Sequence, residues 1–585
     1  MFQKKKFIQR IKVPLCRMLL YVMLLSSVQG LAADIVVQDP AIFVDQAASG
    51  TDIIYITEPN TDQLSYNAFN RFNVDESGAV INNSVNGSYS HLLGQMEGNP
   101  FLQGKEANAV VFDVLGGQQS QVNGLMEMLG RRADFILSNQ HGISVDGAGF
   151  LNMSKVLLTT GRALDETKRR YGVRQGELRI GQNGLYAGEL DHLDLAARRI
   201  HIEGMLAGAD TLRVIAGMNE LELAGAIQTV DIHTTATSHP QQKLAIDASI
   251  FGAVQAGSIY IVSTEHGLGV NIQAPLHATE GELKVKSAGD VSMNSAIAET
   301  RIEVEADQYL QLSGQGNELA ILSANRLQLE SGAGQDSQQV VLQAQHIDSH
   351  SRGHIHIDES LLTGETISLA SDDGLKIQHS FLQASEDLSA LALDYIELDN
   401  SLLHARQLQI NSPRFLQTEG ELNSQTLSLS GIAGTALQQL SFSGQLQSVE
   451  DLHLVADQMQ LQSGILASQG NIDLQAITLS QHALVNAGEG LTLKAEDLNN
   501  SGLVQAGQTL DLDTTDLNNS GLIQSAEGLN LETINFENSG LVQAGQSLEI
   551  NSDTVANQGQ FSANQLELAA NHVHNQGQVL AEQMG

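Results

Sequence analysis

The feature that most constrains the fold of this chain is a short turn that recurs near its C-terminal end at almost constant spacing. Asn and Gly adopt left-handed backbone conformations most readily, so each copy marks a corner between two strands. The copies are Asn500-Ser501-Gly502, Asn519-Ser520-Gly521, Asn538-Ser539-Gly540, Asn557-Gln558-Gly559 and Asn575-Gln576-Gly577, and their glycines are 19, 19, 19 and 18 residues apart. A unit this short has no core of its own, which predicts a solenoid whose units bury apolar side chains by stacking.

Apolar residues occupy the same three positions in each repeat, at Leu491 with Leu493, at Leu498, and at Val504. Polar residues separate paired positions, which gives the period-2 alternation of strands and counts against amphipathic helices. The chain has seven prolines, none after Pro413, as expected where nearly every backbone N–H enters a ladder between coils. We therefore predict an all-β fold, a right-handed parallel β-helix.

The repeat is regular in only one stretch of the chain. We predict regular 19-residue coils over residues 491–585 and irregular coils, with turns of varying length, over residues 251–490. Identical residues on successive coils stack about 4.8 Å apart, so the corner asparagines are predicted to form a structural amide ladder. This ladder comprises Asn500, Asn519, Asn538, Asn557 and Asn575.

Residues 1–33 have the organisation of a secretory signal peptide. Six basic residues precede and border an apolar run from Met18 to Val28, and Gly30 and Ala32 fit the small-x-small pattern of a cleavage site. That run is shorter than the ~20 residues that span a bilayer, which counts against a membrane anchor. We expect the chain to be exported.

The cysteine count and the net charge limit what holds the fold together and which kinds of molecule the chain can bind. The single cysteine, Cys16, lies in the leader, so the mature fold is expected to depend on strand pairing and apolar burial rather than on disulfides. Loss of the six basic leader residues takes the formal net charge from −37 to −43. Such a charge opposes polyphosphate and anionic lipid, and we expect no nucleic-acid partner.

The segment from Asp34 to about Glu220 has more aromatic residues and denser Gly/Asn clusters than the repeats. Its clearest motifs are Asn99-Pro100-Phe101-Leu102 and Asn139-Gln140-His141-Gly142-Ile143-Ser144-Val145-Asp146-Gly147-Ala148-Gly149. In this order the motifs resemble those of the two-partner secretion exoproteins, of which filamentous haemagglutinin is the best-known kind.

The resemblance implies that residues 34–250 form a β-helical secretion domain with an N-terminal cap. An outer-membrane transporter of the same system would recognise this domain in the periplasm. The residues that would act in transporter recognition or in the cap are Asn99, Pro100, Asn139, Gly142, Ile143, Asp146, Gly147 and Gly149. Taken without the family, Asn139, Gly142 and Gly147 are also explained as ordinary turn residues.

Several positions depart from the family pattern. Phe101 replaces an Asn, Gln140 and His141 replace a Pro and an Asn, and Val145 and Ala148 stand where many relatives have a Cys-x-x-Cys pair. The resemblance therefore implies a secretion domain without a disulfide at this place.

The sequence contains no motif that indicates catalytic activity. Hydrolase, zincin, phosphate-loop and dinucleotide-binding motifs are absent, so we expect neither enzymatic activity nor a cofactor. The densest group of potential metal ligands is a weak zinc candidate, because alternate residues share one strand face. It comprises His346, Asp348, His350, His354 and His356. We favour a polar outer face for these residues.

Function at this stage follows from the family resemblance. It implies a secreted or cell-surface protein of a Gram-negative bacterium, acting as a haemagglutinin-like adhesin towards a receptor on host or bacterial cells that the sequence does not identify. The alternative is the N-terminal stalk of a contact-dependent growth inhibition protein, whose effector domain is not in this chain. A β-helical polysaccharide enzyme and a pore-forming cytolysin are further, less favoured alternatives.

Overall fold

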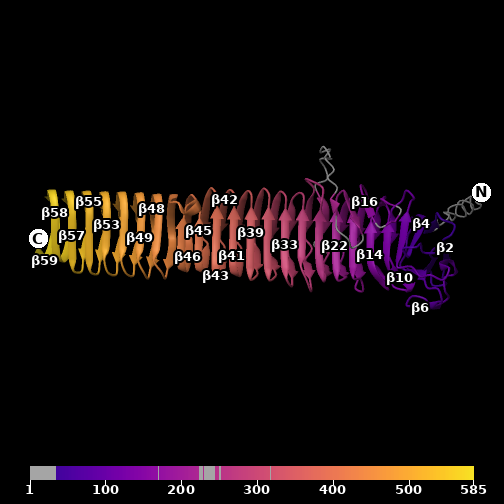
Figure 1. Cartoon of the computed structure of the whole chain (residues 1–585). Coiled ribbons are helices and arrows are strands. Elements are labelled where there is room, and N and C mark those ends of the chain that lie inside the picture. The colour runs from indigo at the N-terminus through magenta and orange to yellow at the C-terminus, as the bar shows by residue number, and fades with distance from the viewer. Residues whose placement is uncertain are drawn as a thin grey trace, which may run out of the picture.

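The computed structural model describes residues 34–585 except 166, 169, 223–227, 230–243, 249–251 and 317, so the expected signal peptide lies outside the described residues. The described chain forms a straight rod of stacked coils with the N-terminal region at one tip and the C-terminus at the other (Figure 1). Regular structure in the described residues is β-strand apart from two 3-10 turns, Pro100–Leu102 and Ile432–Gly434. None of these described residues belongs to a helix long and apolar enough to cross a membrane.

The C-terminal coils show how one repeat folds. One coil consists of β51 (Leu491–Asn500) and β52 (Leu503–Ala506), and the next consists of β53 (Leu510–Asn519) and β54 (Leu522–Ser525). β51 pairs in parallel with β53, and β52 pairs in parallel with β54, always at a step of 19 residues. The predicted all-β solenoid of parallel coils is confirmed.

Corner glycines are required by the stacking of these coils. A Cβ atom on Gly521 would lie 2.1 Å from the backbone oxygen of Gly502, and one on Gly540 would lie 2.0 Å from that of Gly521. Backbone atoms cannot rotate away from such a contact. Glycine therefore recurs at these corners because the corner of the preceding coil lies directly against them.

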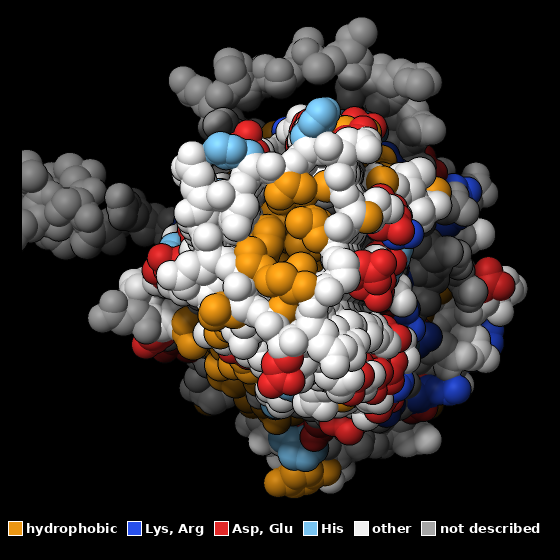
Figure 2. All heavy atoms as spheres, turned by 90° about the vertical axis from the view of Figure 1, so that its left-hand side faces the viewer, with side chains coloured by type: hydrophobic (Ala, Val, Ile, Leu, Met, Phe, Trp, Pro, Cys, Tyr) orange, Lys and Arg blue, Asp and Glu red, His pale blue; other side chains and the backbone are white. Residues whose placement is uncertain are grey.

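Apolar side chains fill the inside of the rod along its whole described length. Leu491, Leu493, Leu498 and Val504 are all buried, as are their equivalents in the following coils, except in the last coil, where Leu568 and Val579 are partly buried and Val573 is 51% exposed. Seen from the C-terminal tip, this core lies at the centre of the coil, with acidic side chains on the outside (Figure 2). Inward apolar and outward charged residues alternate, as period 2 requires.

Coils in the middle of the rod are parallel but vary in length. Leu283 pairs with Ile302 and Ile302 pairs with Leu327, so the step changes from 19 to 25 residues between neighbouring coils. Several corners there are single non-glycine residues with left-handed backbone, among them Glu359 at φ 48° and His379 at φ 46°. Extra residues are accommodated at the corners and at register shifts within strand pairs, such as that between Gly364 and Thr366.

A cap closes the N-terminal end of the core. β1 (Ile35–Val37) pairs antiparallel with β4 (Leu64–Phe72), and β2 (Phe43–Gln46) pairs antiparallel with β3 (Asp52–Tyr55). These are reversals of the direction that the coils follow. The antiparallel pairs place the cap across the open ladder of the first coil, which protects that edge from further strand pairing.

A small second sheet lies on the outside of this region. It contains β15 (Arg162–Ala163), β16 (Arg170–Val173), β23 (Asn219–Glu222) and β24 (Gln228–Thr229). Tyr171 of this sheet is buried in an apolar cluster with side chains such as Leu157 and Ile215 on the outer face of the rod. The N-terminal region is therefore thicker than the bare coils that follow it.

Candidate functional site

Asn99 forms a buried corner in the N-terminal region. Its side-chain nitrogen donates to the backbone oxygens of Ile56 and Asn82, both at 2.9 Å, and its Oδ1 accepts from the backbone nitrogen of Phe101 at 2.9 Å. Pro100 is the first residue of the 3-10 turn that follows. Asn99 is 2% exposed, so in the folded chain its amide holds the turn in place and is closed to a partner protein.

Two further asparagines strengthen this corner. Asn83 donates to the backbone oxygen of Ala107 at 2.9 Å and accepts from the Ala107 nitrogen at 2.7 Å. Asn82 donates to the backbone oxygen of Glu97 at 3.0 Å. Asn82, Asn83 and Asn99 together are called the amide clamp below. The clamp holds both ends of the segment between residues 84 and 107 against the rod.

Asn139 has the same structural role in the next coil. Its side-chain nitrogen donates to the backbone oxygen of Gln118 at 2.9 Å and to the Ser120 hydroxyl at 3.0 Å, and its Oδ1 accepts from the His141 nitrogen at 2.9 Å. The residue is fully buried. Every bond that it makes orients a turn, and none of its partners carries a charge.

The other motif residues shape the following turns. Gly142 and Gly147 have positive φ angles of 117° and 84°, which favour glycine. Ile143 is buried in β12 (Ile143–Val145). Asp146 accepts from the backbone nitrogen of Asn183 at 2.7 Å, one coil later. A Cβ on Gly149 would lie 2.7 Å from the end of the Leu125 side chain, so a larger residue here would require that leucine to shift.

Glu127 contributes to this region although no motif marks it. It is buried in β10 (Leu125–Gly130) and accepts from the Ser90 hydroxyl at 2.6 Å and from the backbone nitrogens of His91 at 2.8 Å and Leu92 at 3.2 Å. These bonds fasten the hairpin of β6 (Ser88–Ser90) and β7 (Gly94–Met96) to the rod. The only signal in the sequence was one acid within an otherwise apolar run, Leu-Met-Glu-Met-Leu.

Exposed aromatic side chains lie beside the Asn99 turn. Phe43, Tyr55 and Phe101 form a cluster with ring centroids 5.6 to 6.4 Å apart. Phe43 is 51% and Phe101 is 39% exposed. Phe101 is the residue that departs from the family motif, and it joins this aromatic cluster on the surface of the cap.

The five potential metal ligands are not brought together. β39 (His346–Ser351) and β40 (His354–Asp358) follow each other around a corner and pair with different strands, so they lie on different faces of the rod. Asp348 forms an ion pair with Arg326 at 2.6 Å. Among the residues that the structure describes, no group of three or more His, Cys, Asp or Glu residues could hold a metal ion.

The corner asparagines of the regular coils hydrogen-bond one another from coil to coil. Each side-chain nitrogen donates to the Oδ1 of the next asparagine, at 2.7 Å for Asn500 to Asn519 and at 2.8 Å for Asn557 to Asn575. The two steps between them are also 2.7 Å. The row is buried apart from the last coil, and each of its first four side-chain nitrogens has the next asparagine as its acceptor.

Comparison with known proteins places this region in a family. The family model described as "TPS secretion domain" matches residues 30–293. The chain belongs to the two-partner secretion exoproteins. The matched segment contains the cap, the amide clamp, Asn139 and the aromatic cluster.

Relatives of this exoprotein include much longer proteins. It is 32% identical over 415 residues to "tRNA nuclease CdiA" of Yersinia mollaretii, a match that covers 68% of this chain and 14% of the relative. It is 32% identical to "Hemolysin" of Serratia marcescens, covering 60% of this chain and 21% of that protein. The solved filamentous hemagglutinin secretion domain aligns with a TM-score of 0.44 at 28% identity, over 50% of this chain and 96% of that domain.

Proposed function

We propose that an outer-membrane transporter exports this exoprotein through its N-terminal domain, residues 34–250, and that the remaining coils form a non-enzymatic rod that acts as an adhesin. The observation that supports it is the TPS secretion domain over residues 30–293, together with the buried clamp that this segment contains. The protein would be released or held at the surface of a Gram-negative cell after passing through the periplasm.

The structure suggests why buried asparagines matter for export. A solenoid grows by adding coils to an end that is already folded, so the first coils and the cap must form before later coils have a template. Asn99 and Asn139 satisfy buried backbone groups in those first coils. In this proposal they act by allowing the cap to fold, while the transporter contacts exposed groups such as the Phe43, Tyr55 and Phe101 cluster.

A toxin-delivery stalk is the second candidate function. It is favoured by the 32% identity to a relative named "tRNA nuclease CdiA" over 68% of this chain. In that case the rod would carry an effector in place of, or in addition to, an adhesive surface. Incubating producing cells with sibling bacteria that lack the system separates the two, because only a delivery stalk fused to an effector inhibits their growth.

Export itself is tested by co-expressing the chain with its transporter and measuring the protein outside the cell. Asn139→Ala and Asn99→Ala are expected to reduce export at least several-fold and to increase proteolysis of the N-terminal domain. Phe101→Ser is expected to reduce export while the purified domain stays resistant to protease. The matched control is Asn183→Ala, at an exposed turn of the same domain, which should be exported normally. Unchanged export of both buried variants would refute the role of Asn99 and Asn139 in folding the domain for export.

A further inference from the structure

One outward face of the rod carries a row of apolar side chains. Outward residues on twelve successive coils stack in register to form this row, called the apolar row below, and most of them are half-buried. The first five members are apolar, the next two polar and the last five apolar. In order they are Ile321, Val341, Leu361, Phe381, Leu402, Glu421, Gln445, Ile465, Leu484, Leu503, Leu522 and Leu541.

A second row lies two residues further along each strand on the same face. It consists mainly of amides and hydroxyls and contains no carboxylate, lysine or arginine. Its members are Ser323, Gln343, Thr363, Gln383, His404, Asn423, Gln447, Ala467, Asn486, Gln505, Gln524 and Gln543. In a chain of net charge −37, this face is almost free of charge, with Glu421 as its carboxylate.

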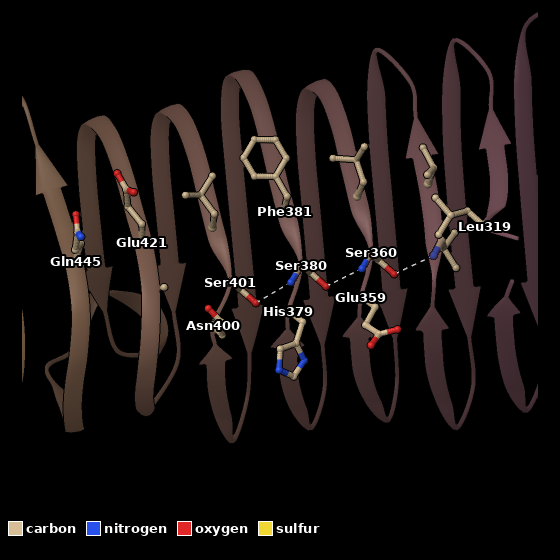
Figure 3. A pocket seen from close by; sticks show the side chains of 15 residues that line it. Leu319, Glu359, Ser360, His379, Ser380, Phe381, Asn400, Ser401, Glu421 and Gln445 are labelled. Carbon is tan, nitrogen blue, oxygen red and sulfur yellow. Dashed lines mark hydrogen bonds between the residues drawn. The ribbon is translucent and has the colours of Figure 1, made fainter. Parts of the chain in front are cut away.

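The N-terminal half of the face is hollowed beside the apolar row. A groove of about 540 Å³ runs past Leu361, Phe381 and Leu402 and ends at Glu421 and Gln445. In Figure 3, Phe381, Glu421 and Gln445 lie in one line, while Glu359, His379 and Asn400 point away on the other side of the corner. Ser360, Ser380 and Ser401 form its floor and are linked by backbone-to-hydroxyl hydrogen bonds of 3.0 and 3.2 Å. The groove gives room for apolar side chains from outside.

The order of residues in the apolar row is symmetric about its centre. Five apolar positions lie on each side of the Glu421 and Gln445 pair, and polar residues, Ser295 and Gln560, bound the row at its two ends. Coil spacing is the same in any two copies of the chain, about 4.8 Å. A second copy that runs antiparallel therefore matches the row position by position.

We propose that two copies of this chain pair through the apolar row as an antiparallel dimer, with the two-fold axis along the strand direction between Glu421 and Gln445. This operation stacks apolar row on apolar row and amide row on amide row, as an isologous contact requires. Leu361 then faces Leu503 of the partner subunit, and Phe381 faces Leu484 of the partner subunit. Glu421 faces Gln445 of the partner subunit, where a carboxylate meets an amide donor.

Charge selects this register over its alternatives. A parallel pairing, or an antiparallel one shifted by one coil towards Glu421, places Glu421 opposite Glu421 of the partner subunit, and facing like charges cost several kcal/mol. In the proposed register, Glu359 lies near the neutral corner at Ser501 and Gly502 of the partner subunit. Each Glu421 is then opposite Gln445 of the partner subunit, and the two Glu421 carboxylates lie diagonally across the axis, about one coil spacing of 4.8 Å apart along the rod.

The size of the face suits a stable dimer. Eleven steps of about 4.8 Å give a length near 53 Å, and two rows of side chains give a width of about 13 Å. The contact would bury roughly 700 Å² on each copy, or about 1,400 Å² in total, within the range of specific stable interfaces.

Sedimentation equilibrium of the full chain tests the assembly, with Cys16→Ser if the leader is retained. We expect a dimer. We expect Leu503→Glu to raise the dissociation constant of the dimer at least about 100-fold, because it places an unpaired charge in the contact. The matched control is Ile477→Glu, on a different face and 49% exposed, which should leave the dimer intact. Circular dichroism should show unchanged strand content in both variants. A monomeric wild-type chain, or a dimer unaffected by Leu503→Glu, would overturn the proposal.

Cross-linking tests the register. Val341 faces Leu522 of the partner subunit, whereas two copies of Val341 are nine coils apart, about 43 Å. A bismaleimide that reaches about 10 Å, the spacing of packed sheets, should join Val341→Cys to Leu522→Cys in a mixture of the two variants and should join neither variant to itself. Self-cross-linking of Val341→Cys would indicate parallel pairing and refute the axis. A monomer whose row binds a glycan or an extended peptide instead would refute the second copy as occupant.

Discussion

Removing one amide from the asparagine row should loosen the regular coils locally and strongly. Asn519 accepts from Asn500 and donates to Asn538, both at 2.7 Å, and its Oδ1 also lies 3.2 Å from the Gly521 nitrogen. Asn519→Ala leaves the Asn500 amide without its acceptor and the Asn538 carbonyl without its donor. Both are 2% exposed, so water does not replace the lost partner.

The expected cost follows from those two groups. A buried polar group left without a partner costs about 1–3 kcal/mol, which gives about 2–6 kcal/mol for the pair. A value of about 4 kcal/mol corresponds to roughly a thousand-fold rise in the opening equilibrium of the coil. The matched control is Asn518→Ala in the same strand. Asn518 is exposed and makes one side-chain bond to Asn499 at 3.0 Å, so we expect a cost below about 1 kcal/mol.

Hydrogen exchange read by mass spectrometry measures both variants where the change occurs. In Asn519→Ala, amides of the coils from 500 to 540 should lose about two to four decades of protection, while the coils before residue 400 should keep theirs. Local opening is the relevant quantity because a long stack of coils does not unfold in one two-state step. If Asn519→Ala and Asn518→Ala changed protection equally, the buried row would contribute no more than an exposed one, and the reasoning would be wrong.

Three further predictions concern other regions of the rod. Glu127→Gln should free the hairpin of residues 88–96 for proteolysis, because a neutral amide replaces the charged acceptor of three bonds, while the coils stay protected. Gly540→Ala should destabilise its coil by more than about 2 kcal/mol, whereas Gly528→Ala, whose Cβ would meet only side chains at 3.3 Å or more, should be tolerated in a thermal melt. The hydrogen bond with Asp358 raises the pKa of His379, so Asp358→Asn should lower it in an NMR titration. The stabilisation from that pair should be complete below the ordinary histidine pKa and be lost as the pH rises through the raised value.

The coil architecture could be predicted because the same pattern of apolar and turn residues recurs in every repeat. Leu491, Leu498 and Val504 have equivalents at every turn, and identical environments on successive coils make one strand assignment support the next. The asparagine row could be located for the same reason, since one step of the repeat carries each amide onto the next. In a repeat protein the repeat length predicts which residues lie against each other from coil to coil, so these contacts do not have to be predicted one by one.

The N-terminal site is not repetitive, so the contacts of its residues could not be predicted from the sequence. The partners of Asn99 are at Ile56 and Asn82, and those of Asn139 are at Gln118 and Ser120. No periodicity relates these positions. The resemblance suggested the candidate residues Asn99 and Asn139, but only the three-dimensional arrangement shows that the two asparagines are buried and that Glu127 holds a hairpin beside them.

The weak zinc candidates of the histidine-rich segment do not form one cluster in the described structure, for a geometric reason. Residues two apart share a strand face only while the strand continues, and between His350 and His354 the chain turns a corner at Arg352 and Gly353. The two halves of the segment therefore diverge onto separate faces, and each histidine finds an ordinary neighbour such as Thr366 or Asp336. A ligand pattern in a solenoid is meaningful only within one strand or one coil-to-coil row.

The apolar row shows how departures from alternation carry information of their own. In each regular coil an inward residue directly follows an outward leucine, as in Leu503 with Val504 and Leu522 with Ile523. Such adjacent apolar pairs break the period-2 pattern, and a single break would be unremarkable. Outward apolar residues at the same position of successive coils stack into one continuous exposed apolar surface, and such a surface is typical of an interaction site. The regular alternation accounts for the core, so the residues that violate it in register are the ones that point to a second molecule.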